Sequence, residues 1–205
     1  MGGAGLRGQS AGETSICTVG VTGSGLTYRG YDVVDLAENT TFEEVAYLLL
    51  YEKLPNSQEL KDYIEKLKSL RGLQPELRNT LECIPKTAHP MDVLRTGCSV
   101  LGNLEQEEDF LNQTDHADRM LSAFPSILSY WYQFSHFGKR IDTETNDDTI
   151  GGHFLHLLHG QKASELHNKV MSISLILYAE HEFNASTFAA RVCASTLSDI
   201  HSAVT

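Results

Sequence analysis

Apolar side chains recur at three- and four-residue spacing along most of this chain, which is the pattern of amphipathic helices. The first long helix is expected to follow Thr41, with Glu44 completing a capping box, and to end before Pro55. We expect a glycine cap at Gly72 after the next helix and a kink at Pro125 in the longest one. Further helices are predicted over residues 57–70, 75–84, 91–104, 115–137, 149–159, 169–179 and 185–197. The pattern therefore predicts an all-α fold, apart from the beginning of the chain.

The beginning of the chain has a β pattern instead. Residues 16–21 and 26–28 are short β-branched or aromatic runs, separated by the turn-forming residues 22–25. They predict a short N-terminal β-hairpin. Asp32 and Asp35 follow, and we expect them to cap the next helix rather than to act as a catalytic pair of carboxylates. No internal repeat or linker marks a domain boundary.

Composition narrows the range of functions. The 205 residues carry a net charge of −11, which argues against a nucleic-acid partner because such proteins present a basic face. No apolar run reaches the roughly 18 residues of a membrane span, and the start has no signal-peptide pattern. The four cysteines are scattered without C-x-x-C spacing, which indicates reduced thiols. These features predict a cytoplasmic protein with no nucleic acid and no membrane among its partners.

Three histidines at 153, 156 and 159 form a candidate metal site. On a helix they would spread over about 120° of one face, and imidazoles at i and i+3 can share a metal ion. However, the nearby Asp147 and Asp148 fall in a loop pattern, and no His-Glu-x-x-His or Glu-x-x-His motif accompanies them. We therefore expect hydrogen-bonded or half-exposed histidines and no metal.

The strongest candidate site is the polar break between two helical patterns near residue 181. Glu180, His181 and Asn184 lie between an apolar run and a new helix start. The amide groups of a helix N-terminus and an imidazole can both bind a small anion. The flanking carboxylates of Glu180 and Glu182 are expected to orient the imidazole and raise its basicity. These residues predict a binding role for His181.

Five segments, read in order along the chain, resemble the citrate synthase family. They are LTYRGYDVVDLAE at 26–38, FEEVAYLLLYEKLP at 42–55, HPMDVLRTGCSVLG at 89–102, DDTIGGHFLHLLHG at 147–160 and YAEHEFNASTFAARV at 178–192. The last two are most similar to the bacterial 2-methylcitrate synthase branch of that family. HPMD and HEFNAS are specific in combination, whereas RGY alone is a weak signal.

The resemblance implies a Claisen-type condensation of propionyl-CoA with oxaloacetate in propionate catabolism, by a homodimer without a cofactor. In such chemistry a carboxylate removes an α-proton from the acyl-CoA, while histidines stabilise the enolate and polarise the ketone. His181 matches the family histidine that binds the keto acid, and Asn184 lies in the same substrate-binding segment. Citrate synthase itself, which uses acetyl-CoA, is the close alternative, because one methylene in a pocket is worth only about 1–3 kcal/mol.

Other parts of the family pattern are missing from these residues. The family has catalytic histidines in GPxHGG-like and GHPxY-like segments and a later catalytic aspartate, and none has a counterpart here; His201 fits neither motif. We therefore expect residues 1–205 to be the N-terminal part of the large domain. The small domain, the C-terminal return of the chain and the catalytic residues would then lie beyond Thr205, and the fragment alone would be inactive. A noncatalytic helical dimerisation module and a histidine-rich metal-binding bundle are alternatives from other classes.

Overall fold

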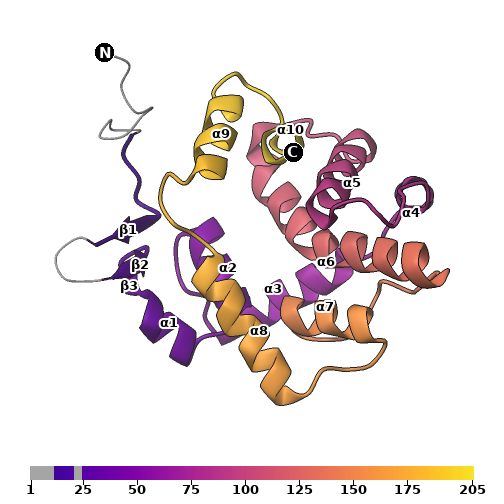
Figure 1. The fold of residues 1–205 in the computed structure, drawn as a ribbon. Coiled ribbons are helices and arrows are strands. Elements are labelled where there is room, and N and C mark those ends of the chain that lie inside the picture. Colours follow the sequence, from indigo (N-terminus) through magenta and orange to yellow (C-terminus); the bar gives the residue numbers. More distant parts are fainter. Residues whose placement is uncertain (1–11, 21–24) are drawn as a thin grey trace, which may run out of the picture.

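A small antiparallel sheet stands at one side of a body of helices in the computed structural model (Figure 1), which describes residues 12–20 and 25–205. The strands are β1 (Cys17–Val19), β2 (Leu26–Tyr28) and β3 (Tyr31–Asp32). The helices are α1 (Val33–Asn39), α2 (Phe42–Tyr51), α3 (Ser57–Ser69), α4 (Pro75–Glu82), α5 (Pro90–Leu104), the 3-10 helix η1 (Phe110–Asn112), α6 (Gln113–Phe137), α7 (Ile150–His159), α8 (Glu165–Tyr178), α9 (Ala185–Ala194) and α10 (Ile200–Val204). This arrangement confirms the prediction of an all-α fold with a short N-terminal sheet.

The sheet is larger than the predicted hairpin. Its order is β1-β2-β3, with Cys17 opposite Tyr28 and Thr27 opposite Asp32. The predicted pairing of β1 with β2 is confirmed, whereas residues 22–24 of the turn predicted at 22–25 lie outside the described residues. The third strand was not predicted, because a two-residue strand leaves no readable alternation in a sequence.

Side-chain caps start several helices where the sequence predicts them. The backbone N–H of Thr41 donates to Glu44 Oε2 at 2.7 Å, and the N–H of Glu44 donates to Thr41 Oγ1 at 3.4 Å, which confirms the capping box of α2. Asp32 caps α1, since its Oδ1 accepts the N–H of Val34 at 2.8 Å. The first helices are therefore set by local chemistry that can be read directly.

Several features of the helices differ from the prediction, among them the end of α9, which lies at Ala194 and not at residue 197. Gly72 does not cap α3, which ends at Ser69 with Leu70 as its cap. The α8 helix begins four residues earlier than expected, because Ser164 accepts the N–H of His167 at 3.3 Å and so provides an N-cap. The short α10, capped by Asp199, was missed; five residues are too few for a helical period to be evident.

The long helix α6 is surrounded by other helices. It contacts α3, α4, α5, α7 and α10, and it continues through Pro125. One core is formed by the sheet with α1, α2, α3, α7 and α8, and a second by α4, α5 and α6. Both cores draw on helices that touch α6, so this helix connects the two halves of the body.

A buried carboxylate fixes α6 against α2 and α3. Asp118 is fully buried and accepts hydrogen bonds from Tyr51 Oη at 2.6 Å, Tyr63 Oη at 2.8 Å and Lys66 Nζ at 2.6 Å. Burying a charge is costly unless it is paired and hydrogen-bonded. The Asp118 cluster meets both conditions, so it sets the position of α6 instead of weakening the core.

Apolar side chains also remain on the surface, most clearly on α8. Leu166, Val170, Leu177 and Tyr178 are exposed there, Tyr178 by 91%. An apolar cavity of about 310 Å³, lined from α2, α5, α6, α7 and α8, opens beside this helix. In the part of the chain that the structure describes, no helix combines the length and apolar character needed to span a membrane.

We predict that Gly97→Ala destabilises the fold. A Cβ at this buried position of α5 would lie 2.6 Å from Ile127 Cγ2 on α6, which is too close for any real contact. Alanine favours a helix by up to about 1 kcal/mol over glycine, but overpacking costs about 1–3 kcal/mol and should dominate. Urea denaturation measures the difference. Ser99→Ala, at an exposed position of the same helix, should change the unfolding free energy by less than about 0.5 kcal/mol. A Gly97→Ala protein more stable than the parent would contradict this packing.

Candidate functional site

The predicted site lies in the connection between two helices. The α8 helix ends at Tyr178 and α9 begins at Ala185, so residues 179–184 contain both His181 and Asn184 (Figure 1). Both side chains are exposed. The structure thus places the two predicted binding residues in one short, solvent-facing junction.

Asn184 has a structural task at this junction. It is the N-cap of α9, and its Oδ1 accepts the backbone N–H of Thr187 at 3.0 Å. The first N–H groups of a helix have no intrahelical acceptor and carry the positive end of the helix dipole. Asn184 therefore fixes a local positive potential three residues after His181, a setting that suits an anionic ligand.

The carboxylates of Glu180 and Glu182, on either side of His181, contact the first strand of the sheet. Glu182 Oε1 accepts the backbone N–H of Val19 at 2.9 Å, and Glu180 Oε1 lies 3.9 Å from Cys17 Sγ. The expectation that these groups orient the imidazole is therefore corrected: both acidic side chains contact β1. They attach the junction to the sheet, because the sheet offers an N–H group that needs an acceptor.

Sequence reasoning missed two residues that contact this junction, Tyr28 and Cys17. The Tyr28 hydroxyl accepts the N–H of Glu180 at 3.3 Å, and the N–H of Glu182 donates to Cys17 Sγ at 2.9 Å. These contacts join positions 152 and 165 residues apart. A pattern read from neighbouring residues cannot reveal such pairs, so nothing in the local sequence indicated them.

The three histidines of α7 have different surroundings. His153 is fully buried, with Nε2 3.0 Å from Ser126 Oγ and Nδ1 3.0 Å from Thr145 Oγ1. His156 Nδ1 lies 2.6 Å from Asp147 Oδ2, and His159 is exposed at the helix end. The expectation of hydrogen-bonded or half-exposed histidines is confirmed. Over residues 12–20 and 25–205, no group of three or more histidine, cysteine or acidic side chains is arranged to hold a metal ion.

His201 lies apart from the α8–α9 junction, on α10. It is buried, and its ring packs edge-on against that of His116 with centroids 5.1 Å apart. Burial lowers the pKa of His201 and the neighbouring His116 lowers it further. The side chain therefore belongs to the packing of α10 on α5 and α6.

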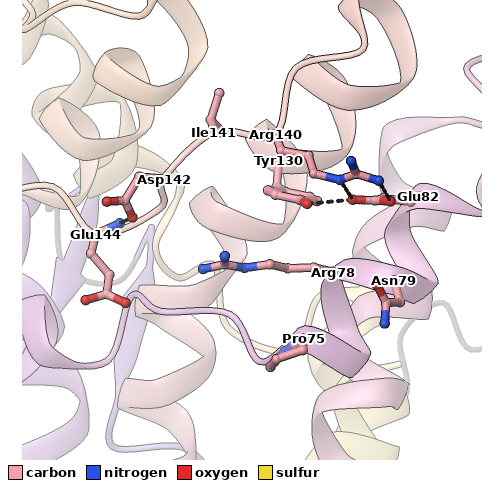
Figure 2. A pocket seen from close by; sticks show the side chains of 9 residues that line it. All are labelled: Pro75, Arg78, Asn79, Glu82, Tyr130, Arg140, Ile141, Asp142 and Glu144. Atoms are coloured by element: carbon pink, nitrogen blue, oxygen red, sulfur yellow. Dashed lines mark hydrogen bonds and ion pairs between the residues drawn. The ribbon is translucent and has the colours of Figure 1, made fainter.

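A second hollow, of about 590 Å³, lies between α4, α6 and the 138–149 loop (Figure 2). It is lined by Pro75, Arg78, Asn79, Glu82, Tyr130, Arg140, Ile141, Asp142 and Glu144. Arg140 forms a two-point ion pair with Glu82, with both N–O distances 2.7 Å, and Tyr130 Oη donates to Glu82 Oε1 at 2.7 Å. The Arg140 and Tyr130 hydrogen bonds lower the pKa of Glu82 to about 2. A carboxylate held ionised in this way ties the loop to α4 and is a poor candidate for a general base.

Comparison with known proteins identifies a family. The sequence profile of "Citrate synthase, C-terminal domain" matches residues 5–205. Over 203 residues, 99% of this chain and 54% of its relative, the sequence is 71% identical to 2-methylcitrate synthase of Shewanella oneidensis. It is 36% identical to citrate synthase of Heyndrickxia coagulans, across 98% of this chain and 54% of that protein.

Solved structures of citrate synthases have the same fold as this chain. Citrate synthase from Thermotoga maritima is 36% identical and superposes with a TM-score of 0.84, over 99% of this chain and 53% of that one. Citrate synthase from Thermoplasma acidophilum, solved as a ternary complex with carboxymethyl coenzyme A and oxaloacetate, is 28% identical and superposes with a TM-score of 0.89, over 97% of this chain and 53% of that one. The chain spans about half the length of the curated relatives it matches.

We predict that His153 makes the fold sensitive to acid. Burial lowers its pKa from 6.5 to about 3, and the positive charge of Arg71 contributes. Between about pH 6.5 and about pH 3 the imidazole is protonated in the unfolded chain and neutral in the folded chain. The free energy of unfolding therefore decreases as pH falls through this range, by up to about 1.4 kcal/mol per pH unit. Urea denaturation at pH 7 and pH 5 measures the loss. A His153→Gln protein should lose less stability over the same interval, and an equal loss in both proteins would contradict the assignment.

Proposed function

The chain belongs to the citrate synthase family, and on that premise we propose that it forms part of a 2-methylcitrate synthase. Such an enzyme condenses propionyl-CoA with oxaloacetate and releases 2-methylcitrate and CoA, in propionate catabolism. The 71% identity to the Shewanella oneidensis protein carries this proposal. The exposed His181 beside the N-terminus of α9 supports it with a site suited to a dicarboxylate.

In this reaction a carboxylate base removes an α-proton from the acyl-CoA, and the enolate carbon attacks the ketone carbon of oxaloacetate. Water then hydrolyses the thioester and frees CoA. We assign His181 to the keto acid, where an imidazole N–H would stabilise the negative charge that develops on the ketone oxygen. Asn184 contributes by starting α9 at the junction, which supplies backbone N–H groups for a carboxylate.

Acetyl-CoA remains the alternative acyl substrate, since relatives named citrate synthase share about a third of these residues. A comparison of kcat/KM for propionyl-CoA and acetyl-CoA in the complete enzyme decides between them. A ratio above about ten in favour of propionyl-CoA would correspond to a pocket fitted to the extra methylene.

The same proposal includes a cytoplasmic homodimer. The apolar residues exposed on α8 and the adjoining apolar cavity support burial against further protein, because a large apolar patch is uncommon on a monomer. A noncatalytic helical dimerisation module would also need such a surface. It would differ in showing no turnover with either acyl-CoA in the complete protein.

We predict no condensation activity for protein made of these 205 residues alone. The GPxHGG-like and GHPxY-like motifs, which carry catalytic histidines in the family, do not occur in this sequence. Loss of proton abstraction and of oxyanion stabilisation costs at least about 10² each in rate. The assay follows CoA release with oxaloacetate and either acyl-CoA, and the complete enzyme is the positive control. Turnover at the control rate from pure 205-residue protein would overturn this prediction.

We predict that His181→Ala in the complete enzyme weakens oxaloacetate use without unfolding the protein. The side chain is exposed, so its removal opens no core cavity. We expect kcat/KM for oxaloacetate to fall at least about tenfold, with an unchanged melting temperature. His159→Ala removes another exposed histidine and should stay within about twofold of the parent. Unaltered kinetics in His181→Ala would refute the role, and a large fall in melting temperature would indicate a structural one.

A further inference from the structure

The N-terminal sheet holds the residues on both sides of His181, and we propose that Tyr28 and Cys17 are positioning residues of the keto-acid site. This inference rests on the proposed function, because it takes His181 as the group that binds the keto acid. It assigns to the sheet a task in substrate binding, carried out through the backbone of the α8–α9 junction.

Tyr28 binds the chain just before His181. It is fully buried on β2, and its hydroxyl donates to the carbonyl of Ile176 at 2.8 Å, within the last turn of α8. The same oxygen accepts the N–H of Glu180 at 3.3 Å. The last carbonyls of a helix need hydrogen-bond donors from outside the helix. One rigid side chain therefore fixes both the end of α8 and the residue that precedes His181.

The first strand binds the chain just after His181. The N–H of Glu182 donates to Cys17 Sγ at 2.9 Å, and Glu182 Oε1 accepts the N–H of Val19 at 2.9 Å. Glu182 has φ 56°, in the left-handed region that residues with a side chain seldom adopt. Such a conformation persists when the surrounding contacts determine it. Here β1 supplies those contacts with two hydrogen bonds to one residue.

His181 lies exposed between these two attachments. Because little protein packs around the ring, the direction of the ring follows from the backbone that carries it. Phe183, two residues after His181, contacts α9, because the Arg191 guanidinium lies 4.8 Å from the centre of its ring. The junction is thus held at residues 180, 182 and 183, and the free imidazole is presented from a fixed backbone.

Hydrogen exchange on the 205-residue chain tests the attachment without any substrate. Tyr28→Phe removes the hydroxyl and keeps the buried ring. We expect the amides of residues 179–183 to exchange at least about fivefold faster, the effect of losing one hydrogen bond of ordinary strength. Tyr31→Phe is the matched control, since that ring is exposed on the neighbouring strand. Equal exchange at residues 179–183 in both variants would overturn the proposal.

Kinetics of the complete enzyme test the consequence for the site. Tyr28→Phe and Cys17→Ala should raise KM for oxaloacetate about fivefold to tenfold and leave KM for the acyl-CoA within about twofold. Cys17→Ser restores an acceptor for the N–H of Glu182 and should recover most of the loss. A purely structural role would lower the amount of active enzyme and leave KM for both substrates unchanged, which would overturn the proposal.

The His181→Ala enzyme separates the two possible failures. An altered oxaloacetate KM in His181→Ala, with a parental KM in Tyr28→Phe, would refute the positioning role and leave the proposed function intact. A parental oxaloacetate KM in His181→Ala would refute the proposed function, and the role of the sheet with it, even if hydrogen exchange still responded to Tyr28→Phe.

Discussion

The burial of α6 is the constraint on which the rest of the structure depends. Its 25 residues contact other helices on several sides, so polar side chains on its surface become buried and require partners. Asp118 binds α2 and α3, Arg119 forms an ion pair with Glu105 and bonds the Leu70 carbonyl, and Gln133 donates to the Leu157 and Leu158 carbonyls. Each of these partners is specific, so α6 fixes the register of its neighbours as well as burying their apolar faces.

The position of α6 affects the candidate site through the packing of α7 on α6 and of α8 on α7. Ser126 on α6 lies 3.0 Å from His153 on α7, and α7 packs on α8. The far end of α8 is then held by Tyr28 from the sheet. The junction that carries His181 is therefore fixed from two directions, by the helical body at one end of α8 and by the sheet at the other. Residues distant in sequence meet there because both ends of α8 need partners.

The sequence predicts local structure well and distant contacts poorly, for a physical reason. Helix starts at Thr41 and Asp32 depend on side chains two or three residues from the amides they bind, so a short pattern contains the whole interaction. The position of His181 at a helix junction follows from the same kind of reading. The contacts of Glu180 and Glu182 with β1 do not, because a carboxylate beside a histidine in sequence is free to turn to any unpaired donor that the fold brings near. Only the folded chain decides which donor that is.

Burial assigns different chemistry to two histidines of the same chain. His153 has both ring nitrogens within 3.0 Å of hydroxyl oxygens, and its pKa of about 3 keeps it neutral at physiological pH. It has no hydrogen-bonding capacity left for a ligand, so its contribution is to join α6, α7 and the 138–149 loop. His181 is exposed at a helix junction, beside the positive end of α9. A ring in that position can bind an anion without first breaking a structural contact. The difference in burial therefore makes His153 a packing residue of α7 and leaves His181, after α8, suited to ligand recognition.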